Sequence, residues 1–438
     1  MNLSPARRNT SLRNTFRTLF LTGLGGALEN FDFIVFVMFI KVIAQLFFPP
    51  DIPTWVAQLQ TFAIFATGNL VRPVGAIVLA HFGDKLGRKR TFSFSIWLMA
   101  IATLGIAVTP TFATIGAAAP ALLLLLRILQ GIALGGELPG AWTFISEHAP
   151  RGRTGFVCGI VMALLALGHL LGIFSATVVF RLFSSAEVQA FAWRLPFLFG
   201  AALAIIAGFR RRWLTETPVF EEMLRKNQLA TELPLKMVLR SHLRGVLISV
   251  ALGWLFTSVI IVLLEMTPTL LQTVYGIPVN SALEASTVAT LFLAASYPVS
   301  GLLSDLMGRG LFLVIGVSLL AVCIYLFFTL LPAYSNFLFP LYALTCVSAS
   351  VITGFLPVMI ESFPAAIRFT GVAFSYSVAY AFFGGLMPPL IAFGLRFSPL
   401  AHMYALLFSC LVVFVVGIVF LVSAKPKAML PQTSPEGT

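Results

Sequence analysis

The feature that most constrains this chain is a succession of long apolar runs separated by short polar breaks. A helix needs about 20 apolar residues to cross a bilayer. Runs of that length occur over approximately residues 17–47, 54–82, 91–110, 118–146, 154–183, 189–212, 243–274, 281–305, 310–332, 335–361, 370–396 and 399–423. Only 10% of the 438 residues are charged, against about 25% in soluble proteins. The pattern excludes a soluble globule and predicts an all-α integral membrane protein with twelve transmembrane helices.

The basic residues are distributed unevenly along the chain. Lys and Arg number 28 against 16 Asp and Glu, and most of them fall in alternate polar breaks and near the two ends of the chain. Cytoplasmic loops of membrane proteins carry such an excess, so we expect both termini in the cytoplasm. The same asymmetry accounts for the net charge of +12 without nucleic acid as a partner.

The polar break at 213–242 divides the chain into two related halves. The segment HFGDKLGRKR (81–90) is echoed by GLLSDLMGRG (301–310), in which three residues recur 221 positions later: Asp84 and Asp305, Gly87 and Gly308, Arg88 and Arg309. A second echo links EHAPRGRTG (147–155) with ESFPAAIRFTG (361–371). Two parallel repeats with a central site are the architecture of alternating-access transporters. We therefore predict two pseudo-symmetric six-helix bundles, 17–212 and 243–423, a cytoplasmic connector at 213–242 with short surface helices, and cytoplasmic tails at 1–16 and 424–438.

Several motifs make the sequence similar to the major facilitator superfamily. GDKLGRKR matches the signature of the loop between helices 2 and 3, and RILQG (127–131) matches the Arg-x-x-Gln-Gly motif of helix 4. The chain resembles in particular the metabolite:proton symporter branch, which includes proline/betaine, α-ketoglutarate, citrate and shikimate permeases. The matching stretches are GALENFDF (26–33), RPVGAIVLAHFGDKLGRKR (72–90), RILQGIALGGE (127–137), SEHAPRGRTGF (146–156), WRLPF (193–197), ETPVF (216–220) and ESFPAAIRFTGVAFSYSVAYAFFGG (361–385). The resemblance implies a bacterial inner-membrane protein that couples import of a small molecule to protons.

The chain departs from that branch at positions that the resemblance would place in the cavity. Asn30 stands where the branch usually has Trp, and Leu138-Pro139 stands where a Tyr usually follows the helix 4 Gly-Gly-Glu. Helix 5 keeps the glycine spacing of the antiporter signature but continues with Ile173 where antiporters have Pro. These departures favour an unusual substrate and symport rather than drug export.

Ionisable residues inside a membrane span are costly and mark candidate functional sites. Glu29 and Asp32, three residues apart on helix 1, lie near the bilayer midplane, as does Glu137, while Arg127 lies further out. Burial disfavours a charged carboxylate and a neighbouring guanidinium favours it, so these four residues are the candidates for proton coupling. The alternative is a set of fixed salt bridges that hold helices 1, 2 and 4 together.

A second group of residues is predicted to bind substrate. Arg72 precedes Pro73, and a guanidinium there can hold a carboxylate through paired hydrogen bonds; its alternative role is a structural partner for Glu29 or Glu137. The other candidates are polar or aromatic residues within spans: Asn30, Trp142, His169, Glu265, Tyr376 and Tyr380. The alternative is a hydrogen-bonded interior histidine for His169, a water-exposed group at the outer end for Glu265, and helix packing for the aromatic residues.

The repeated loop motif predicts a gate at the inner membrane surface. Asp84, next to Gly83, is expected to accept hydrogen bonds from the start of helix 11, near Phe369 to Gly371, because a helix N-terminus favours negative charge. Arg88 is expected to hold Glu147. Asp305 and Arg309 are predicted to do the mirrored task at helix 5, and the full gating set is Gly83, Asp84, Gly87, Arg88, Glu147, Asp305, Gly308, Arg309, Glu361 and Arg368.

The leading functional hypothesis is a proton-driven symporter that imports a small organic anion. Uptake of a zwitterionic osmolyte such as proline or betaine, an exporter and a non-transporting sensor are the alternatives. A pump or a membrane enzyme is disfavoured because the sequence has no Gly-Lys pair of a Walker loop and no HExxH motif. Four isolated cysteines give no disulfide or zinc spacing. We therefore expect no metal and no cofactor other than the coupling proton, with the bilayer and a small-molecule substrate as partners of a monomer.

Overall fold

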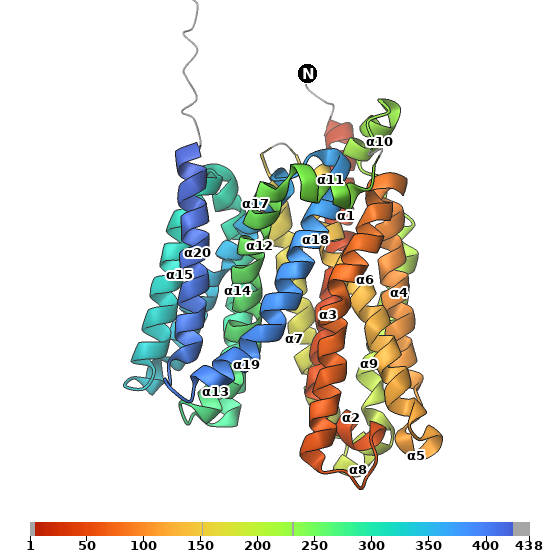
Figure 1. The fold of residues 1–438 in the computed structure, drawn as a ribbon, viewed down its shortest axis with the longest axis vertical. Coiled ribbons are helices and arrows are strands. Elements are labelled where there is room, and N and C mark those ends of the chain that lie inside the picture. Colours follow the sequence, from red (N-terminus) through yellow and green to blue (C-terminus); the bar gives the residue numbers. More distant parts are fainter. Residues whose placement is uncertain (1–4, 151, 230–231, 424–438) are drawn as a thin grey trace, which may run out of the picture.

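The computed structural model describes residues 5–150, 152–229 and 232–423, and these ranges form a helical protein without a strand. Figure 1 shows two bundles side by side, joined at one end by the connector. Within the described ranges, twelve helical segments are long and apolar enough to cross a membrane. Each coincides with one of the predicted runs, so the predicted fold class is confirmed.

The bounds of the elements follow the predicted breaks. The first half contains α1 (Pro5–Met38), α2 (Ile40–Phe47), α3 (Thr54–Leu86), α4 (Arg88–Val108), α5 (Phe112–Ile115), α6 (Ala118–His148), α7 (Thr154–Leu182), α8 (Ser185–Glu187), η1 (Val188–Ala192) and α9 (Arg194–Arg211). The connector forms two short helices, α10 (Pro218–Arg225) and α11 (Pro234–Ser241), where short surface helices were expected. Helix α1 begins inside the predicted tail 1–16, whereas residues 1–4 and the tail 424–438 lie outside the described ranges.

The second half repeats the first with more interruptions. It contains α12 (Leu243–Ser258), η2 (Val259–Met266), α13 (Thr267–Thr273), α14 (Val279–Met307), α15 (Arg309–Leu330), η3 (Ser335–Phe337), α16 (Leu338–Ala349), η4 (Ser350–Gly354), α17 (Phe355–Glu361), η5 (Ala365–Ile367), α18 (Arg368–Ala379), η6 (Tyr380–Gly384), α19 (Gly385–Gly394) and α20 (Ala401–Ser423). Both η2 and η6 are π-helical turns, a form that often occurs at functional sites. The Thr267 hydroxyl donates to the Val262 carbonyl (2.8 Å) across the end of η2, next to Pro268.

Glycines bring helix backbones into contact within and between the halves. A Cβ on Gly131 of α6 would collide with the Gly68 carbonyl of α3. A Cβ on Gly301 of α14 would collide in the same way with the Gly155 carbonyl of α7 in the other half. Such small residues let membrane helices approach closely. The halves meet chiefly along α7 with α14 and α3 with α18, and α18 also contacts α6.

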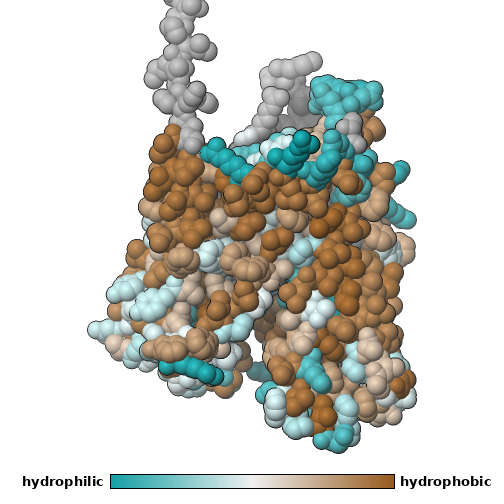
Figure 2. Space-filling view, in the orientation of Figure 1, coloured by the Kyte–Doolittle hydropathy of each residue, from teal (hydrophilic) through white to brown (hydrophobic). Residues whose placement is uncertain are grey.

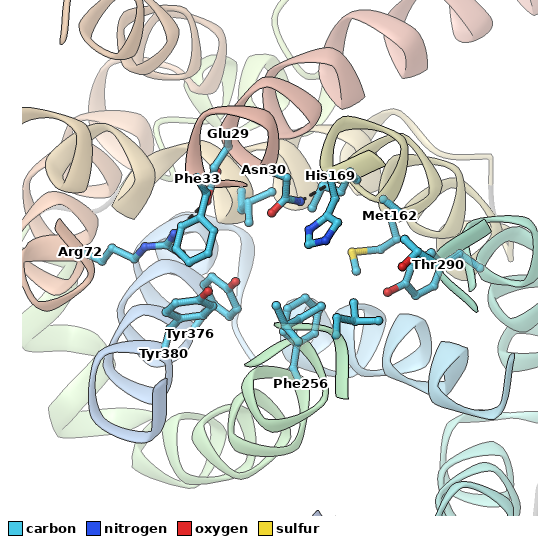
Figure 3. Close-up of a pocket in the computed structure, with 16 residues that line it drawn as sticks. Glu29, Asn30, Phe33, Arg72, Met162, His169, Phe256, Thr290, Tyr376 and Tyr380 are labelled. Atoms are coloured by element: carbon cyan, nitrogen blue, oxygen red, sulfur yellow. Dashed lines mark hydrogen bonds and ion pairs between the residues drawn. The ribbon is translucent and has the colours of Figure 1, made fainter. Parts of the chain in front are cut away.

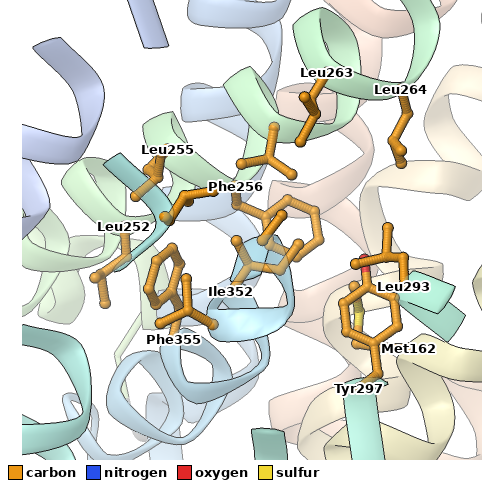
Figure 4. Packing of buried hydrophobic residues seen from close by; sticks show 14 of the residues in the cluster. Met162, Leu252, Leu255, Phe256, Leu263, Leu264, Leu293, Tyr297, Ile352 and Phe355 are labelled. Atoms are coloured by element: carbon orange, nitrogen blue, oxygen red, sulfur yellow. The ribbon is translucent and has the colours of Figure 1, made fainter. Parts of the chain in front are cut away.

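One apolar core extends across the boundary between the halves. Met162 of α7 packs with Leu293 and Tyr297 of α14, and the cluster continues to Phe256 of α12 and Phe355 of α17 (Figure 4). The outer surface is hydrophobic over a broad belt, and a cleft separates the two halves at the end away from the connector (Figure 2). The molecule is thus closed at the connector end and open at the other.

Candidate functional site

A small cavity of about 40 Å³ lies between the halves. Figure 3 shows side chains from both halves pointing into it. The lining residues are Glu29, Asn30, Phe33, Arg72, Leu138, Met162, Leu165, Ala166, His169, Phe256, Ile260, Leu264, Thr290, Tyr297, Tyr376 and Tyr380. Six of the predicted substrate or coupling residues therefore meet here: Glu29, Asn30, Arg72, His169, Tyr376 and Tyr380. Asn30 and Leu138, the two departures from the symporter branch, both face this cavity.

A buried ion pair forms one wall of the cavity. The Arg72 Nη2 atom lies 3.3 Å from Glu29 Oε1, and both side chains are 3% exposed or less. The Arg72 guanidinium also lies over the Tyr380 ring, 4.1 Å from its centroid. Glu29 Oε2 and Arg72 Nε are buried without a hydrogen-bond partner in the described protein. The pair thus keeps bonding capacity that the protein leaves unused.

The opposite wall carries weaker polar groups. The Asn30 side-chain amide donates to the Leu165 carbonyl at 3.4 Å. The His169 ring points toward the centre of the cavity, beside Asn30 and facing Met162 (Figure 3). Most of the remaining lining is apolar or aromatic. The cavity therefore has one ion pair at one side and hydrogen-bonding groups at the other.

Asp32 and Arg127 form a separate buried network in the first half. Asp32 accepts hydrogen bonds from Gln130 Nε2 (2.6 Å) and Thr103 Oγ1 (3.1 Å) and lies 3.5 Å from Arg127 Nη1. Arg127 stacks on Phe36, with its Cζ 3.5 Å from the ring centroid. None of these residues lines the cavity. The carboxylates predicted on one face of helix 1 thus have different partners: Glu29 pairs across to α3, and Asp32 pairs across to α6.

Glu137 is buried in the first half and does not line the cavity. Its carboxylate pairs with Arg211 of α9 and accepts a hydrogen bond of 2.5 Å from Ser95 of α4. Arg211 also donates to the Phe92 carbonyl and is fully buried. The structure therefore pairs Glu137 with Arg211 and pairs Arg72 with Glu29, so the alternative pairing of Arg72 with Glu137 is not formed.

Two further predicted substrate residues lie outside the cavity. Trp142 is fully buried and packs edge-on against Tyr376 and Phe256, with ring centroids 4.8 and 5.7 Å apart. It therefore supports the lining rings from behind. Glu265 lies in a larger space of about 950 Å³ between the halves, whose walls include Phe62 and Phe382. This space corresponds to the cleft of Figure 2 and is called the vestibule below.

The predicted gate is assembled at the connector end. Asp84 is fully buried and accepts hydrogen bonds from the Phe369 and Thr370 amides (3.3 and 2.9 Å) at the start of α18. A Cβ on Gly83 would collide with the Phe369 ring. Gly87 ends α3 with a φ of 117°, which favours glycine. The predicted contact between Asp84 and helix 11 is confirmed.

Arg88 and Glu147 complete this half of the gate. Arg88 Nε lies 3.1 Å from Glu147 Oε2, as predicted, and Arg88 also donates to the Ala365 carbonyl at 2.6 Å. Arg368 of α18 reaches Glu147 from the second half at 3.1 Å. The Thr217 hydroxyl, from the ETPVF segment before α10, donates to Glu147 at 2.6 Å. Glu147 thus holds both halves and the connector together.

The second copy of the motif makes the mirrored contacts. Asp305 accepts hydrogen bonds from the Gly155 and Phe156 amides (2.8 and 2.9 Å) at the start of α7. Arg309 pairs with Asp305 at 3.0 Å and with Glu361 at 2.9 Å. Gly308 repeats the positive φ of Gly87, at 83°. The two copies of the motif thus form two contacts at this end of the protein, which are called the first latch (Asp84 with α18) and the second latch (Asp305 with α7) below. Both latches are closed.

Comparisons with known proteins agree with this architecture. The sequence matches the Major Facilitator Superfamily over residues 22–385. It is 34% identical to the inner membrane metabolite transport protein YhjE of Escherichia coli (strain K12), over 87% of this chain and 88% of that protein. It is 32% identical to a putative proline/betaine transporter of Staphylococcus haemolyticus (strain JCSC1435), over 85% and 80%. It is 34% identical to the alpha-ketoglutarate permease of Escherichia coli (strain K12), over 82% and 83%.

Solved structures share the fold at low sequence identity. The proton:xylose symporter XylE bound to 6-bromo-6-deoxy-D-glucose has a TM-score of 0.77 and 17% identity, over 95% of this chain and 97% of that one. The transporter FucP in the outward conformation has a TM-score of 0.70 and 13% identity, over 92% and 98%. This chain belongs to the major facilitator superfamily, and it is a multi-pass membrane transporter rather than an enzyme.

Proposed function

We propose that the chain is a proton-coupled symporter that imports a small carboxylate across the bacterial inner membrane by alternating access. The observation that carries the proposal is the Glu29–Arg72 pair, which faces the cavity between the halves with unused bonding capacity on both partners. Planar guanidinium groups bind carboxylates through paired hydrogen bonds. A substrate carboxylate is therefore the ligand that Arg72 suits best.

Competition for Arg72 links the proton to the substrate. While Glu29 is charged, it occupies the guanidinium and repels an incoming anion. When Glu29 takes up a proton, the pair loses its attraction and Arg72 becomes available to the substrate carboxylate. Proton and anion then bind together, which is the requirement for symport. Glu29 is better placed than Asp32 for this step, since the Asp32 carboxylate is occupied by Gln130 and Thr103 away from the cavity.

The distribution of basic residues between the two ends of the protein indicates which end faces the cytoplasm. The latched end carries Arg88, Lys89 and Arg90 at the α3–α4 junction and the basic end of α9, and such residues mark the cytoplasmic side. The vestibule then opens outward, and both termini are cytoplasmic. The coupling proton is the only cofactor this cycle requires. One chain encloses the whole cavity, which supports a monomeric transporter.

A second candidate is uptake of a zwitterion such as proline or betaine. The rings of Phe33, Phe256, Tyr376 and Tyr380 line the cavity, and aromatic faces attract quaternary ammonium groups. The name of the S. haemolyticus relative points the same way. Arg72 would hold the carboxylate in this case too, so the two candidates differ only in the group placed at the aromatic side.

Uptake into proteoliposomes tests the proposal. Purified protein is assayed with radiolabelled carboxylates, proline and betaine, each with an imposed inward proton gradient. We expect accumulation of a carboxylate that collapses when a protonophore is added. Accumulation that resists the protonophore and requires sodium would refute proton coupling. Accumulation of betaine alone would replace the anion by the zwitterion.

A further inference from the structure

A groove on the outside of the protein lies where the inner end of α3 meets the connector helix α11, away from the transport cavity. Its volume is about 850 Å³. Val78 and Phe82 of α3 form one wall, and Leu235 and Leu239 of α11 form the other, together with Lys236 and Arg240. Figure 1 shows α11 at the level where the membrane helices end. The groove therefore lies at the boundary between the hydrophobic belt and the hydrophilic rim of Figure 2.

The apolar walls of the groove are exposed on the protein. Val78 and Phe82 are 44% and 47% exposed, and Leu239 on α11 is 43% exposed. On the other side of α11, Val238 is fully buried, so the helix packs on the protein by one face and leaves a second apolar face outside. Helix α3 is long and apolar enough to cross a membrane, so these exposed apolar side chains suit contact with lipid acyl chains. A surface helix with an apolar face is typical of the membrane interface.

The charged groups at the groove favour a negatively charged ligand. Lys236 and Arg240 are one helical turn apart on α11, and both are exposed. The described lining of the groove contains no carboxylate. Lys236 lies 3.1 Å from Glu232, but both side chains of this pair are more than half exposed, and such pairs contribute little. Arg240 has no ion pair within the described ranges.

We propose that this groove binds an anionic phospholipid of the inner leaflet, with acyl chains between α3 and α11 and the phosphate at Lys236 and Arg240. Basic pockets beside membrane helices on the cytoplasmic side suit such headgroups. One wall of the site belongs to α3 of the first half and the other to the connector helix α11, which packs against α18 and α12 of the second half and also against α3. A bound lipid therefore contacts the first half and the connector next to the closed gate. The proposal does not depend on the identity of the transported substrate.

Lipid titration of the whole purified protein in detergent, followed by native mass spectrometry, tests this site. Phosphatidylglycerol and phosphatidylcholine with identical acyl chains are compared on the wild type, on the double variant Lys236→Gln/Arg240→Gln, and on Arg225→Gln/Lys226→Gln. The last variant removes the same charge at the C-terminal end of α10, where both side chains are exposed outside the groove. From the contribution of a single Lys or Arg to binding at an anionic membrane surface, we expect removal of both to weaken phosphatidylglycerol binding about 30-fold.

We expect the wild type and the α10 variant to prefer phosphatidylglycerol, and the groove variant to lose that preference while binding phosphatidylcholine as before. Since the substituted side chains are exposed, equal unfolding temperatures in phosphatidylcholine confirm that all three proteins fold. The proposal is overturned if the groove variant keeps the wild-type preference or if the α10 variant loses as much. It is also overturned if inorganic phosphate alone abolishes the preference of the wild type for phosphatidylglycerol, since the site would then bind a free anion.

Discussion

Replacing Asp84 by Asn tests whether the first latch holds the inner gate shut. Asp84 is fully buried and accepts the Phe369 and Thr370 amides in the first turn of α18, with Arg88 at 3.5 Å. An asparagine keeps one acceptor oxygen but replaces the second by an amide that cannot accept a hydrogen bond. It also removes the charge that the helix N-terminus favours. Opening of the inner gate separates α3 from α18, so we expect the substitution to destabilise the inward-closed state selectively.

The size of the effect follows from the burial of the carboxylate. A charge at a helix terminus contributes up to about 2 kcal/mol in a partly buried site, and a hydrogen bond to a charged group adds about 1.5–3 kcal/mol. Returning the buried charge to water offsets part of this loss. A net change of about 1–2 kcal/mol remains, which shifts the ratio of inward-open to inward-closed molecules by about 5- to 30-fold.

Distances across the vestibule measure this shift. Spin labels at Asp51, before α3, and at Asn280, in the first turn of α14, report the outer opening from exposed positions on opposite halves. The four native cysteines are buried, which limits background labelling. We expect Asp84→Asn to increase the population with a short outer distance, whereas Glu222→Gln on the exposed face of α10 leaves the distribution unchanged. The reasoning is refuted if Asp84→Asn keeps the wild-type distribution and full transport. Asp305→Asn should shift it in the same direction but less, because the adjacent Glu361 is 54% exposed and water screens the charges there.

Four more predictions concern the buried ion pairs. The Glu29→Gln variant should bind the carboxylate with an affinity that does not change with pH, because the amide mimics the protonated acid. Calorimetry over a pH series measures this, and an affinity that still falls with rising pH contradicts it. Arg72→Lys should weaken carboxylate binding with little change in unfolding temperature, since lysine lacks the two-donor fork; equal affinity would make Arg72 structural. Asp32→Asn should keep accumulation in vesicles, because Glu29 carries the coupling proton in the proposed cycle; loss of accumulation with exchange retained would make Asp32 the carrier. Glu137→Gln should lower stability by about 3–5 kcal/mol because it leaves Arg211 buried and unpaired; thermal scans should then show recovery when Arg211→Met is added.

The contacts of the gate could be predicted because the sequence places its residues at the ends of helices. Asp84 and Asp305 each lie three residues before a glycine that ends a helix, and the two copies are 221 positions apart along the chain. Once the two-bundle topology is known, it brings a carboxylate at the end of one helix close to the backbone amides at the start of another. Repetition of the motif supplied that topology, so the sequence alone was enough to identify the partners near Phe369.

The partners of the buried carboxylates were less accessible to prediction. Glu29 and Asp32 are three residues apart, which at 3.6 residues per turn separates their directions by about 60° around α1. In a bundle interior this angle is enough to direct one side chain to α3 and the other to α6. Hydropathy gives the depth of a residue but not its direction within the bundle.

Arg211 was missed although a signal was present. It stands between Arg210 and Arg212 in a basic cluster that reads as a cytoplasmic helix end. The buried face of α9, however, runs through Ala204, Ala207 and Gly208 to Arg211. Continuing the helical period of these small residues past the last apolar residue selects Arg211 as the arginine that turns inward.

The helix pair α3–α18 connects the cavity with the gate. At its inner end Asp84 holds the amides of Phe369 and Thr370. Near the membrane centre, the Arg72 guanidinium of α3 lies on the Tyr380 ring that follows α18. Twelve residues of α3 separate the two attachments, about 18 Å at 1.5 Å per residue. In the proposed cycle, a carboxylate that draws Arg72 away from Tyr380 and Glu29 removes the attachment near the cavity and leaves the Asp84 contact and the apolar packing between α3 and α18 to hold the two helices together. Substrate binding and opening of the Asp84 part of the gate then act on the same helix pair, while the Asp305 contact with α7 has to open as well.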